Sequence, residues 1–214
     1  METAKAEQSG RPQRSGLQQR KRQLTVDAIV RAAQQGMREH GLDVTMDTIA
    51  ALAEVDRRTV FRHFPTREDI MSTAFVAMHA DYLGDVPPYA GEDWQNWLVE
   101  VARWEHRTSA QFGRLLLDFQ TRHLSTRMAA VFDKERQAHK DAWAMITSTL
   151  WQAAGGDGPS PELLRQIVNT HLSPMFTQAV LRDAEGTADL AAQWATTTIA
   201  STLRQLLGAQ GVEA

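Results

Sequence analysis

The chain of 214 residues contains no cysteine and no long uninterrupted apolar run. Without cysteine, the protein can form neither disulfides nor thiolate metal sites. No apolar segment near the N-terminus has the length of a signal peptide or of a membrane-spanning helix. We therefore expect a soluble intracellular protein with no membrane partner. The length alone allows either one large core or a small head joined to a larger body.

Sequence motifs of common catalytic and metal sites are also missing. The chain has neither a His-Glu-x-x-His motif nor a glycine-rich phosphate loop. Glu135 and His139 are spaced one residue too far apart for the Glu-x-x-His pair of metal-binding helix bundles. We expect no catalytic residues, no metal site and no cofactor, and hence no enzyme.

No strand-length alternation of apolar and polar residues occurs in the chain, whereas apolar residues recur at helical spacing. This pattern predicts an all-α fold of about nine helices. The first helix is predicted over 24–40, with Gly41 at its end. Pro174 should kink or interrupt the eighth helix. The other helices are expected to begin after the capping residues Thr45, Asp56, Thr66, Asp93, Ser109, Ser125 or Thr126, Ser160 and Thr187.

Residues 57–67 contain no carboxylate, although the chain has a formal net charge of −3. The basic residues of this stretch are Arg57, Arg58, Arg62, His63 and Arg67. Residues 1–72 hold 12 Lys+Arg and 10 Asp+Glu, against 11 and 16 in residues 73–214. This division predicts that a polyanion approaches the N-terminal part of the chain. Two short helices joined by a tight turn over 45–64 would present the basic stretch.

A set of residues recurs in a recognisable order over 22–72: Gly41, Leu42, Thr45, Ile49, Ala50, Val55, Asp56, Thr59, Val60, Phe61, Phe64 and Arg67. This order resembles the DNA-binding head of the TetR (tetracycline-repressor-like) family of bacterial regulators. The resemblance implies a helix-turn-helix domain over 23–68 and a ligand-binding and dimerisation domain over 69–214, in the cytoplasm of a bacterium. It also implies a transcriptional regulator, most commonly a repressor that a small-molecule inducer releases from a palindromic operator.

Three positions depart from the family pattern. Glu54 stands where the family usually has glycine in the turn; a left-handed backbone there would cost about 1–2 kcal/mol. Phe61 replaces a tyrosine that commonly binds a phosphate, so this contact is absent. Arg58 replaces a small residue, and its long side chain could instead read a base.

We assign base reading in double-stranded DNA to Arg57 and Arg58, because a guanidinium can donate two hydrogen bonds to guanine. The resemblance implies phosphate binding for Thr45, Thr59, His63 and Arg67. Arg62 could either read a base or bind a phosphate. Thr45 would also act as a helix cap.

The first 22 residues carry six Lys+Arg and two Glu and few large apolar side chains. This composition predicts a disordered basic arm over 1–22. The arm would either reach a DNA groove or remain an ordinary solvated tail.

Tryptophan is concentrated in the middle of the chain. Aromatic residues at helical spacing usually form a core, but the resemblance places an inducer pocket in this region. The predicted pocket residues are Trp94, Trp97, Trp104, His106, Phe112, Asp118, Phe119, His123 and Trp143, with Glu105 a further polar group. Aromatic walls with a carboxylate would suit a planar or cationic ligand, whereas Arg103, Arg107 and Arg114 would suit an acid.

One DNA-binding head spans only a few base pairs, so a regulator of this kind needs a homodimer with two heads about 34 Å apart. The last two predicted helices are rich in apolar residues and would form the interface, unless both face their own core. The predicted interface residues are Leu164, Val168, Met175, Trp194, Ile199 and Leu203.

A different function remains open from the sequence. An all-helical interaction module could use the same basic head to bind an acidic protein or a membrane surface. Salt-dependent binding without sequence preference would favour that function.

Overall fold

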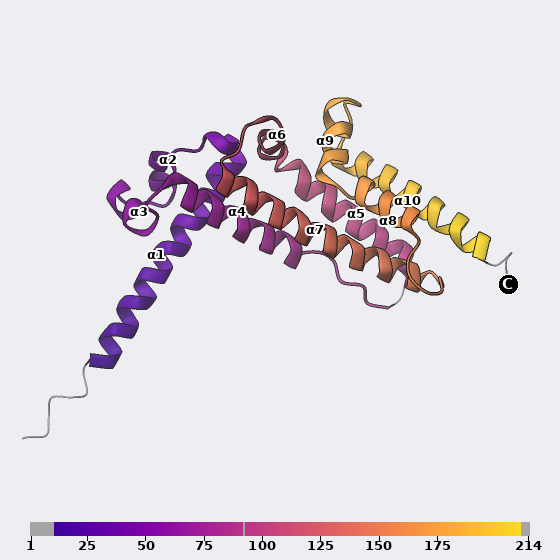
Figure 1. Ribbon diagram of the computed structural model, residues 1–214, viewed down its shortest axis with the longest axis horizontal. Coiled ribbons are helices and arrows are strands. Elements are labelled where there is room, and N and C mark those ends of the chain that lie inside the picture. Colours follow the sequence, from indigo (N-terminus) through magenta and orange to yellow (C-terminus); the bar gives the residue numbers. More distant parts are fainter. Residues whose placement is uncertain (1–10, 92, 211–214) are drawn as a thin grey trace, which may run out of the picture. The chain divides into compact units, whose positions relative to one another are not determined.

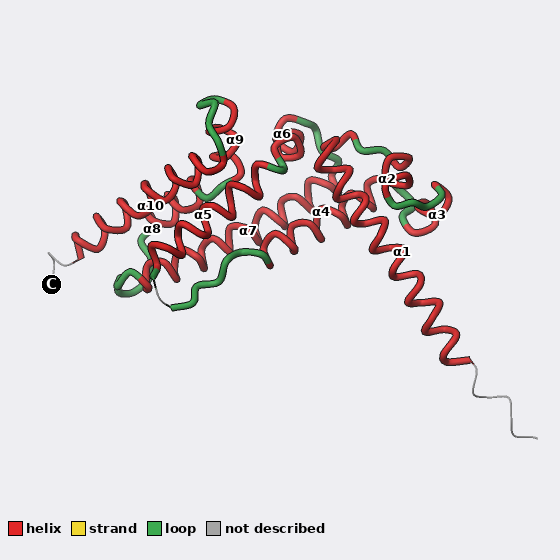
Figure 2. Tube along the Cα trace, turned by 180° about the vertical axis from the view of Figure 1, so that it is seen from behind, coloured by secondary structure: helices red, strands yellow, loops and turns green. Residues whose placement is uncertain are grey.

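The computed structural model describes residues 11–91 and 93–210, and the chain divides into two compact units, 1–75 and 76–214. All regular structure in the described residues is helical (Figure 2), which confirms the all-α prediction. The boundary between the units lies after residue 75, inside helix α4 (Arg67–Gly84), whereas the DNA-binding domain was expected to end at residue 68. None of the described helices is both long enough and apolar enough to cross a membrane.

The N-terminal unit contains three helices, a short 3-10 turn and the start of a fourth helix (Figure 1). These elements are α1 (Arg11–His40), η1 (Gly41–Asp43), α2 (Met46–Leu52), α3 (Arg57–His63) and α4 (Arg67–Gly84). Gly41 has a φ of +60°, so it ends α1 in the left-handed conformation that glycine adopts without strain. The core of the unit consists of Ile29, Ala33, Met37, Ile49, Val60 and Ile70, all fully covered.

The described part of the expected basic arm is helical, which corrects the prediction for residues 11–22. These residues form the first turns of α1, and residues 16–24 are solvent-exposed. Helix nucleation is costly but propagation is not. The packed part of α1 around Ile29 supplies the nucleus, and the glutamines, arginines and lysine before it have good helix propensity. Residues 1–10 lie outside the described residues.

The C-terminal unit contains six helices after the end of α4. They are α5 (Trp94–Ala110), α6 (Gly113–Thr121), α7 (Thr126–Ala153), α8 (Glu162–His171), α9 (Pro174–Arg182) and α10 (Ala188–Gln210). Helix α10 packs along both α5 and α8 (Figure 1). The core between these helices is built from large side chains, among them Trp97, Val101, Trp143, Leu150, Trp151, Leu164, Ile199 and Leu203.

Pro174 interrupts the predicted eighth helix, so the described residues form ten α-helices where about nine were expected. The proline is the first residue of α9, and the Ser173 side chain accepts a hydrogen bond from Phe176 N. A proline lacks the N–H that a helix interior requires but fits the first helical position. The interruption therefore follows from the chemistry of this residue.

Three of the predicted caps in the C-terminal unit are confirmed: Asp93, Ser125 and Thr187 each accept a backbone N–H of the following helix. Two were wrong. Ser109 lies inside α5 and donates its hydroxyl to Glu105 Oε1 (2.8 Å). Ser160 lies one residue before the N-cap position of α8, where its carbonyl accepts from Arg165.

Candidate functional site

The helix-turn-helix begins at Thr45, which caps α2 as predicted: its Oγ1 accepts the N–H of Thr48 at 3.1 Å. The turn after α2 contains Glu54 with a φ of +54°, so the backbone there is left-handed and the condition for strain at this non-glycine residue is met. Asp56 occupies the N-cap position of α3, but its side chain makes no cap hydrogen bond. The predicted capping role of the Asp56 carboxylate is therefore corrected. The turn is held by backbone bonds, including Val55 N to Ala50 O (3.1 Å).

Arg57 and Arg58 occupy the first turn of α3, and both are exposed. Arg57 has an acidic neighbour after all, because Nη1 lies 3.0 Å from the carboxylate of Asp47 on α2. Its guanidinium carbon also lies 5.3 Å from the centre of the Phe61 ring. The two paired side chains are 60% and 65% exposed, so their ion pair orients Arg57 more than it stabilises the fold. Arg58 has no ion-pair partner among the described residues.

His63 does not present a cation to solvent. Both ring nitrogens are covered and have no hydrogen-bond partner among the described residues. Burial lowers the pKa of the His63 imidazole, and the charges of Arg62 and Arg22 lower it further. The imidazole is therefore neutral at pH 7, and the expected phosphate contact would require the ring to move. Arg62 is exposed and Thr59 is half-buried.

Arg67 has a structural role that sequence reasoning missed. Its Nε donates to Val44 O (2.6 Å), and its Nη2 donates to Leu42 O. The guanidinium thus ties the start of α4 to the segment that precedes α2. The capping box at Thr66 and Asp69 is present as predicted, with Thr66 N donating to the Asp69 carboxylate and Asp69 N to Thr66 Oγ1, each at 3.1 Å.

The predicted pocket residues lie mostly in the packed interior of the C-terminal unit. Trp97 and Trp143 belong to its core, and Trp94 and Trp104 pack against that core. His106 and Phe119 are buried, Phe112 and Asp118 are half-buried, and His123 is exposed. Several of the predicted pocket residues therefore form the core, as their aromatic spacing also allowed. Their role in ligand binding stays a prediction.

Four of the six predicted interface residues, Leu164, Val168, Ile199 and Leu203, are fully covered by their own chain. Their burial favours the alternative that these helices face their own core. Met175 and Trp194 remain exposed, at 42% and 44%. Sequence spacing cannot tell which side of an apolar helix the rest of the same chain covers. Leu163, 51% exposed on α8, was not predicted.

Comparison with known proteins finds relatives of the N-terminal unit. Residues 29–74 match the family profile described as "Bacterial regulatory proteins, tetR family". The HTH-type transcriptional regulator TcmR of Streptomyces glaucescens is 36% identical over 85 residues, which cover 38% of this chain and 37% of TcmR. The N-terminal unit is therefore similar to this family of bacterial regulatory proteins. The curated relative is thus matched over little more than a third of its length.

Solved structures of several regulators share the fold at low sequence identity. FadR of Bacillus subtilis, solved in complex with stearoyl-CoA, has a TM-score of 0.60 at 16% identity and covers 80% of this chain and 96% of its own. FadR of Bacillus halodurans has a TM-score of 0.62 at 17% identity, covering 82% and 94%. The flavonoid-responsive regulator FrrA has a TM-score of 0.55 at 21% identity, covering 83% and 96%.

The interior of the C-terminal unit also holds a polar cluster around Glu105 whose contacts the sequence did not reveal. Glu105 is fully buried and accepts hydrogen bonds from the hydroxyls of Tyr82 and Ser109. The Tyr82 ring lies 4.8 Å from the Trp104 ring and 5.8 Å from the His139 ring, centre to centre. Burial raises the pKa of Glu105 to about 7, although both hydrogen bonds oppose the rise. Burial, together with the Glu105 charge, also raises the pKa of the Tyr82 hydroxyl.

A second buried pair lies beside this cluster. His79 Nδ1 is 2.7 Å from Glu135 Oε2, and the two side chains are only 13% and 10% exposed. His139 stacks on Trp143 with ring centres 4.2 Å apart, and burial and His79 lower its pKa to about 4. Glu135 and His139 are one helical turn apart on α7 and therefore lie on the same face of the helix. This spacing was the sequence signal from which their proximity could have been predicted.

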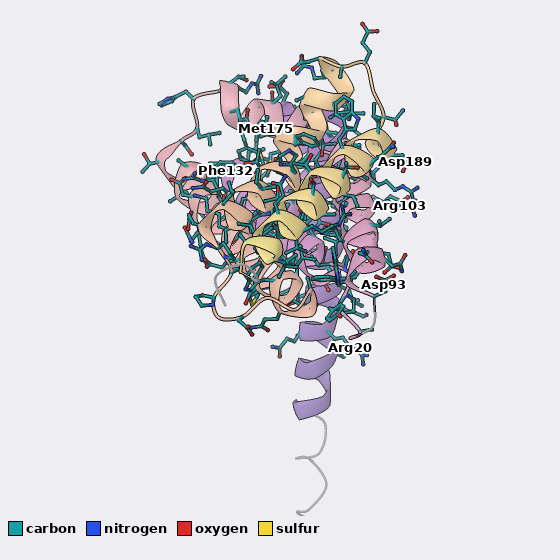
Figure 3. The ribbon with its side chains drawn as sticks, turned by 90° about the vertical axis from the view of Figure 1, so that its right-hand side faces the viewer. Arg20, Asp93, Arg103, Phe132, Met175 and Asp189 are labelled. Atoms are coloured by element: carbon teal, nitrogen blue, oxygen red, sulfur yellow. The ribbon has the colours of Figure 1, made fainter. Side chains whose placement is uncertain are left out.

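Two hollows lie on the surface of the C-terminal unit. One, of about 450 Å³, is lined by Gly113, Leu117, Asp118, Gln178 and Arg182. The other, of about 400 Å³, lies between α5 and α10 and is lined in part by Arg103 and Asp189. Figure 3 shows these two residues on one side of the unit and Phe132 on the other. Of the predicted pocket residues, Asp118 is the only one among the linings of these two hollows.

Proposed function

We propose that the protein is a sequence-specific DNA-binding transcriptional regulator of the TetR family. The observation that carries the proposal is the position of Arg57 and Arg58, exposed in the first turn of the second helix of a helix-turn-helix. The family profile matches this same part of the chain. In such motifs the N-terminal residues of the second helix contact base edges in the major groove.

The two arginines would read guanine in each half-site. A guanidinium that donates to guanine O6 and N7 discriminates against other bases by about 1–3 kcal/mol. Asp47 and Phe61 restrict where the Arg57 guanidinium lies, which reduces the freedom it loses on binding. Thr45, Thr59 and Arg62 would hold phosphates, whereas Arg67 would act by keeping α4 attached to the residues before α2.

Two copies of the chain would bind one palindromic operator. We place the dimer interface on the exposed apolar residues of α8 and α10, Leu163 and Trp194, because the larger predicted set is mostly covered. Contiguous exposed apolar patches are typical of protein–protein contact surfaces, and α8 packs against α10. Trp194→Arg and Leu163→Arg should each shift sedimentation from dimer to monomer, whereas Met145→Arg, at a 67% exposed site on α7, should not.

A small-molecule effector would bind the C-terminal unit and release the operator, so that the regulator acts as a repressor. FadR of B. subtilis holds stearoyl-CoA, and FrrA is described as flavonoid-responsive. A ligand can shift the DNA-binding equilibrium only by the difference between its affinities for the two states. An effector that binds equally well with and without operator would contradict the mechanism.

Selection from random DNA duplexes by the purified full-length chain tests the main proposal. We expect enrichment of one inverted repeat with guanine in each half. Arg57→Ala and Arg58→Ala should then each relax the preference at single positions. Arg204→Ala, an exposed arginine on α10, is the control and should leave the enriched sequence unchanged. Salt-dependent binding without any enriched sequence would instead support the interaction-module function.

A further inference from the structure

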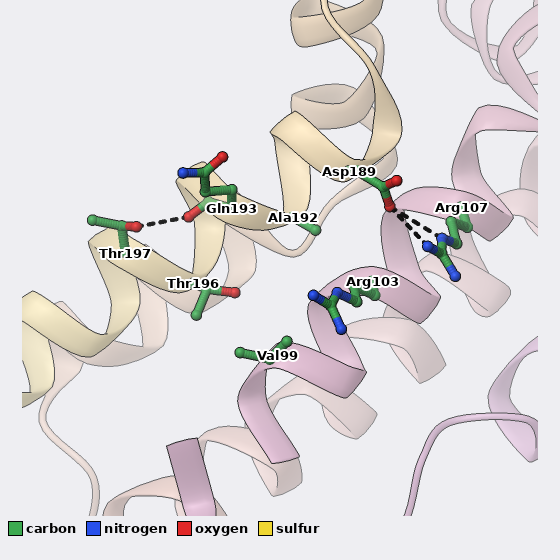
Figure 4. A pocket seen from close by; sticks show the side chains of 8 residues that line it. All are labelled: Val99, Arg103, Arg107, Asp189, Ala192, Gln193, Thr196 and Thr197. Atoms are coloured by element: carbon green, nitrogen blue, oxygen red, sulfur yellow. Dashed lines mark hydrogen bonds and ion pairs between the residues drawn. The ribbon is translucent and has the colours of Figure 1, made fainter. Parts of the chain in front are cut away.

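The groove between α5 and α10 combines apolar and polar walls in a volume of about 400 Å³ (Figure 4). Its α5 side is formed by Val99, Arg103 and Arg107, and its α10 side includes Asp189, Ala192 and Thr196. A volume of this size lies within the range of small-molecule sites, about 300–1,000 Å³. The chemistry of the lining therefore decides which class of ligand the groove fits.

The charges in the groove are not balanced. Arg107 donates to Asp189 Oδ1 from both Nε (3.1 Å) and Nη2 (3.0 Å). Arg103, one helical turn earlier, has no ion-pair or hydrogen-bond partner among the described residues, and its guanidinium faces the same groove (Figure 4). Like charges four residues apart on a helix disfavour each other. One positive charge thus stays uncompensated, in a unit that holds 11 Lys+Arg and 16 Asp+Glu.

The rest of the groove lining, on both helices, offers neutral contacts. Ala192 is buried and Val99 half-buried at the groove, so both present apolar surface. The Thr197 hydroxyl already donates to Gln193 O (2.8 Å). The Thr196 hydroxyl makes no hydrogen bond with any described residue and lies on the groove side in Figure 4. It can therefore donate to a ligand.

We propose that this groove binds a small amphiphilic anion, with a carboxylate or phosphate group between Arg103 and Arg107 and its apolar part on Val99 and Ala192. A guanidinium presents a planar fork of donors that matches the paired oxygens of either group. Asp189 Oδ1 holds Arg107 in place and makes no ion pair with Arg103. The site goes beyond DNA recognition, and none of its residues lies in the helix-turn-helix.

Calorimetric titration of the full-length protein tests the proposal without any DNA. The probes are octanoate, inorganic phosphate and, as a cation of similar apolar length, octyltrimethylammonium. We expect saturable binding of octanoate and none of the ammonium probe. Arg103→Gln should weaken octanoate binding by about tenfold to a hundredfold, the range for a lost hydrogen bond to a charged group. Arg204→Gln, which removes an arginine of α10 outside the groove, should change it less than about twofold.

The outcomes separate the sources of the anion. Octanoate binding with little phosphate binding would identify a carboxylate whose apolar part contributes, whereas comparable binding of both would identify the anionic group as the main determinant. Octanoate binding that survives Arg103→Gln, or no saturable binding of either anion, would overturn the proposal. Loss of the dimer in Arg103→Gln with unchanged octanoate binding would overturn it too, and would make the groove a contact between subunits. Thermal unfolding of each variant checks that its fold is intact.

Discussion

The two units of the molecule differ in the solvent exposure of the charged side chains that form contacts. In the N-terminal unit, the ion pair of Arg57 and Asp47 lies at the surface, with side chains 60% and 65% exposed. In the C-terminal unit, Glu105 is fully buried, and the pair of His79 and Glu135 is nearly so. Exposed charges keep their hydration and remain available to a partner. Buried charges lose hydration and persist only where hydrogen bonds compensate for part of that loss.

Because of this difference, substitutions in the two units should affect different properties, namely binding in the N-terminal unit and stability in the C-terminal unit. The exposed arginines of α3 can exchange solvent for DNA at little structural cost, so substitutions there should change binding and not folding. The buried groups of the C-terminal unit are coupled to its packing, because Tyr82 and Ser109 both donate to Glu105. Substitutions or protonation there should change the stability of the unit.

The largest expected effect is on core packing. Trp143 is fully buried and its indole N–H donates to Leu172 O (2.5 Å). Trp143→Ala should lower the free energy of unfolding by about 3–5 kcal/mol, measured by urea denaturation. Phe61→Ala, at a 39% exposed ring in the N-terminal unit, should cost about 1 kcal/mol or less. Equal losses from the two variants would remove the contrast between the units.

The next effect is a pH dependence of stability that arises from Glu105. Its pKa of about 7 in the folded protein lies above the ordinary 4.5, so the folded state holds the proton more firmly between these two pH values. The stabilisation is complete below pH 4.5 and is lost as pH rises to about 7, by up to about 3 kcal/mol.

Glu105→Gln cannot lose this proton, so its free energy of unfolding should improve relative to wild type as pH rises from 4.5 to 7. Burial lowers the pKa of both His106 and His139 to about 4. These two histidines stabilise the fold increasingly as pH rises from 4 to 6.5. This trend is the same in wild type and in Glu105→Gln, so it cancels when the free energy of unfolding of one is subtracted from that of the other. Glu100→Gln, an exposed carboxyl on the same helix, should keep the wild-type profile. A variant curve parallel to wild type would mean that Glu105 titrates normally.

A smaller effect concerns the exposed ion pair. Asp47→Ala should reduce the preference for guanine by a few-fold, because Arg57 loses the carboxylate that orients it, in keeping with a pair worth about 0–1 kcal/mol. Binding to unrelated DNA should stay equal or rise slightly, since a negative charge near the phosphates is removed. Competition binding with operator and unrelated duplexes measures both. Glu39→Gln, on α1, is the control for loss of charge, and an equal loss of preference in that variant would contradict the orienting role.

The smallest effect compares the same backbone strain in both units. Glu54 has a φ of +54° and Glu185 a φ of +49°. Replacing either residue by glycine should raise the free energy of unfolding by up to about 1 kcal/mol, because glycine adopts this conformation without a Cβ clash. Alanine at the same positions keeps the Cβ atom and should not stabilise. Thermal unfolding of the four variants tests whether the strain is equal in the two units.

Local sequence signals predicted the local structure well. Thr45, the capping box at Thr66 and the interruption at Pro174 all depend on atoms within a few residues of one another, so their geometry follows from the neighbouring sequence. The prediction of serine caps was less successful, because a serine such as Ser109 can either cap a helix or form a hydrogen bond within one. The left-handed turn at Glu54 was predictable only from the resemblance to the family.

The sequence by itself determined the all-helical class, the position of the helix-turn-helix and the concentration of basic residues in α3. Only the tertiary structure decided that Asp47 meets Arg57, that Arg67 binds the carbonyls of Leu42 and Val44, and that Leu164 and Ile199 face their own core. The physical reason is the range of the interactions. Helix periodicity and capping act over one or two turns, whereas burial and ion pairing depend on which helices pack together.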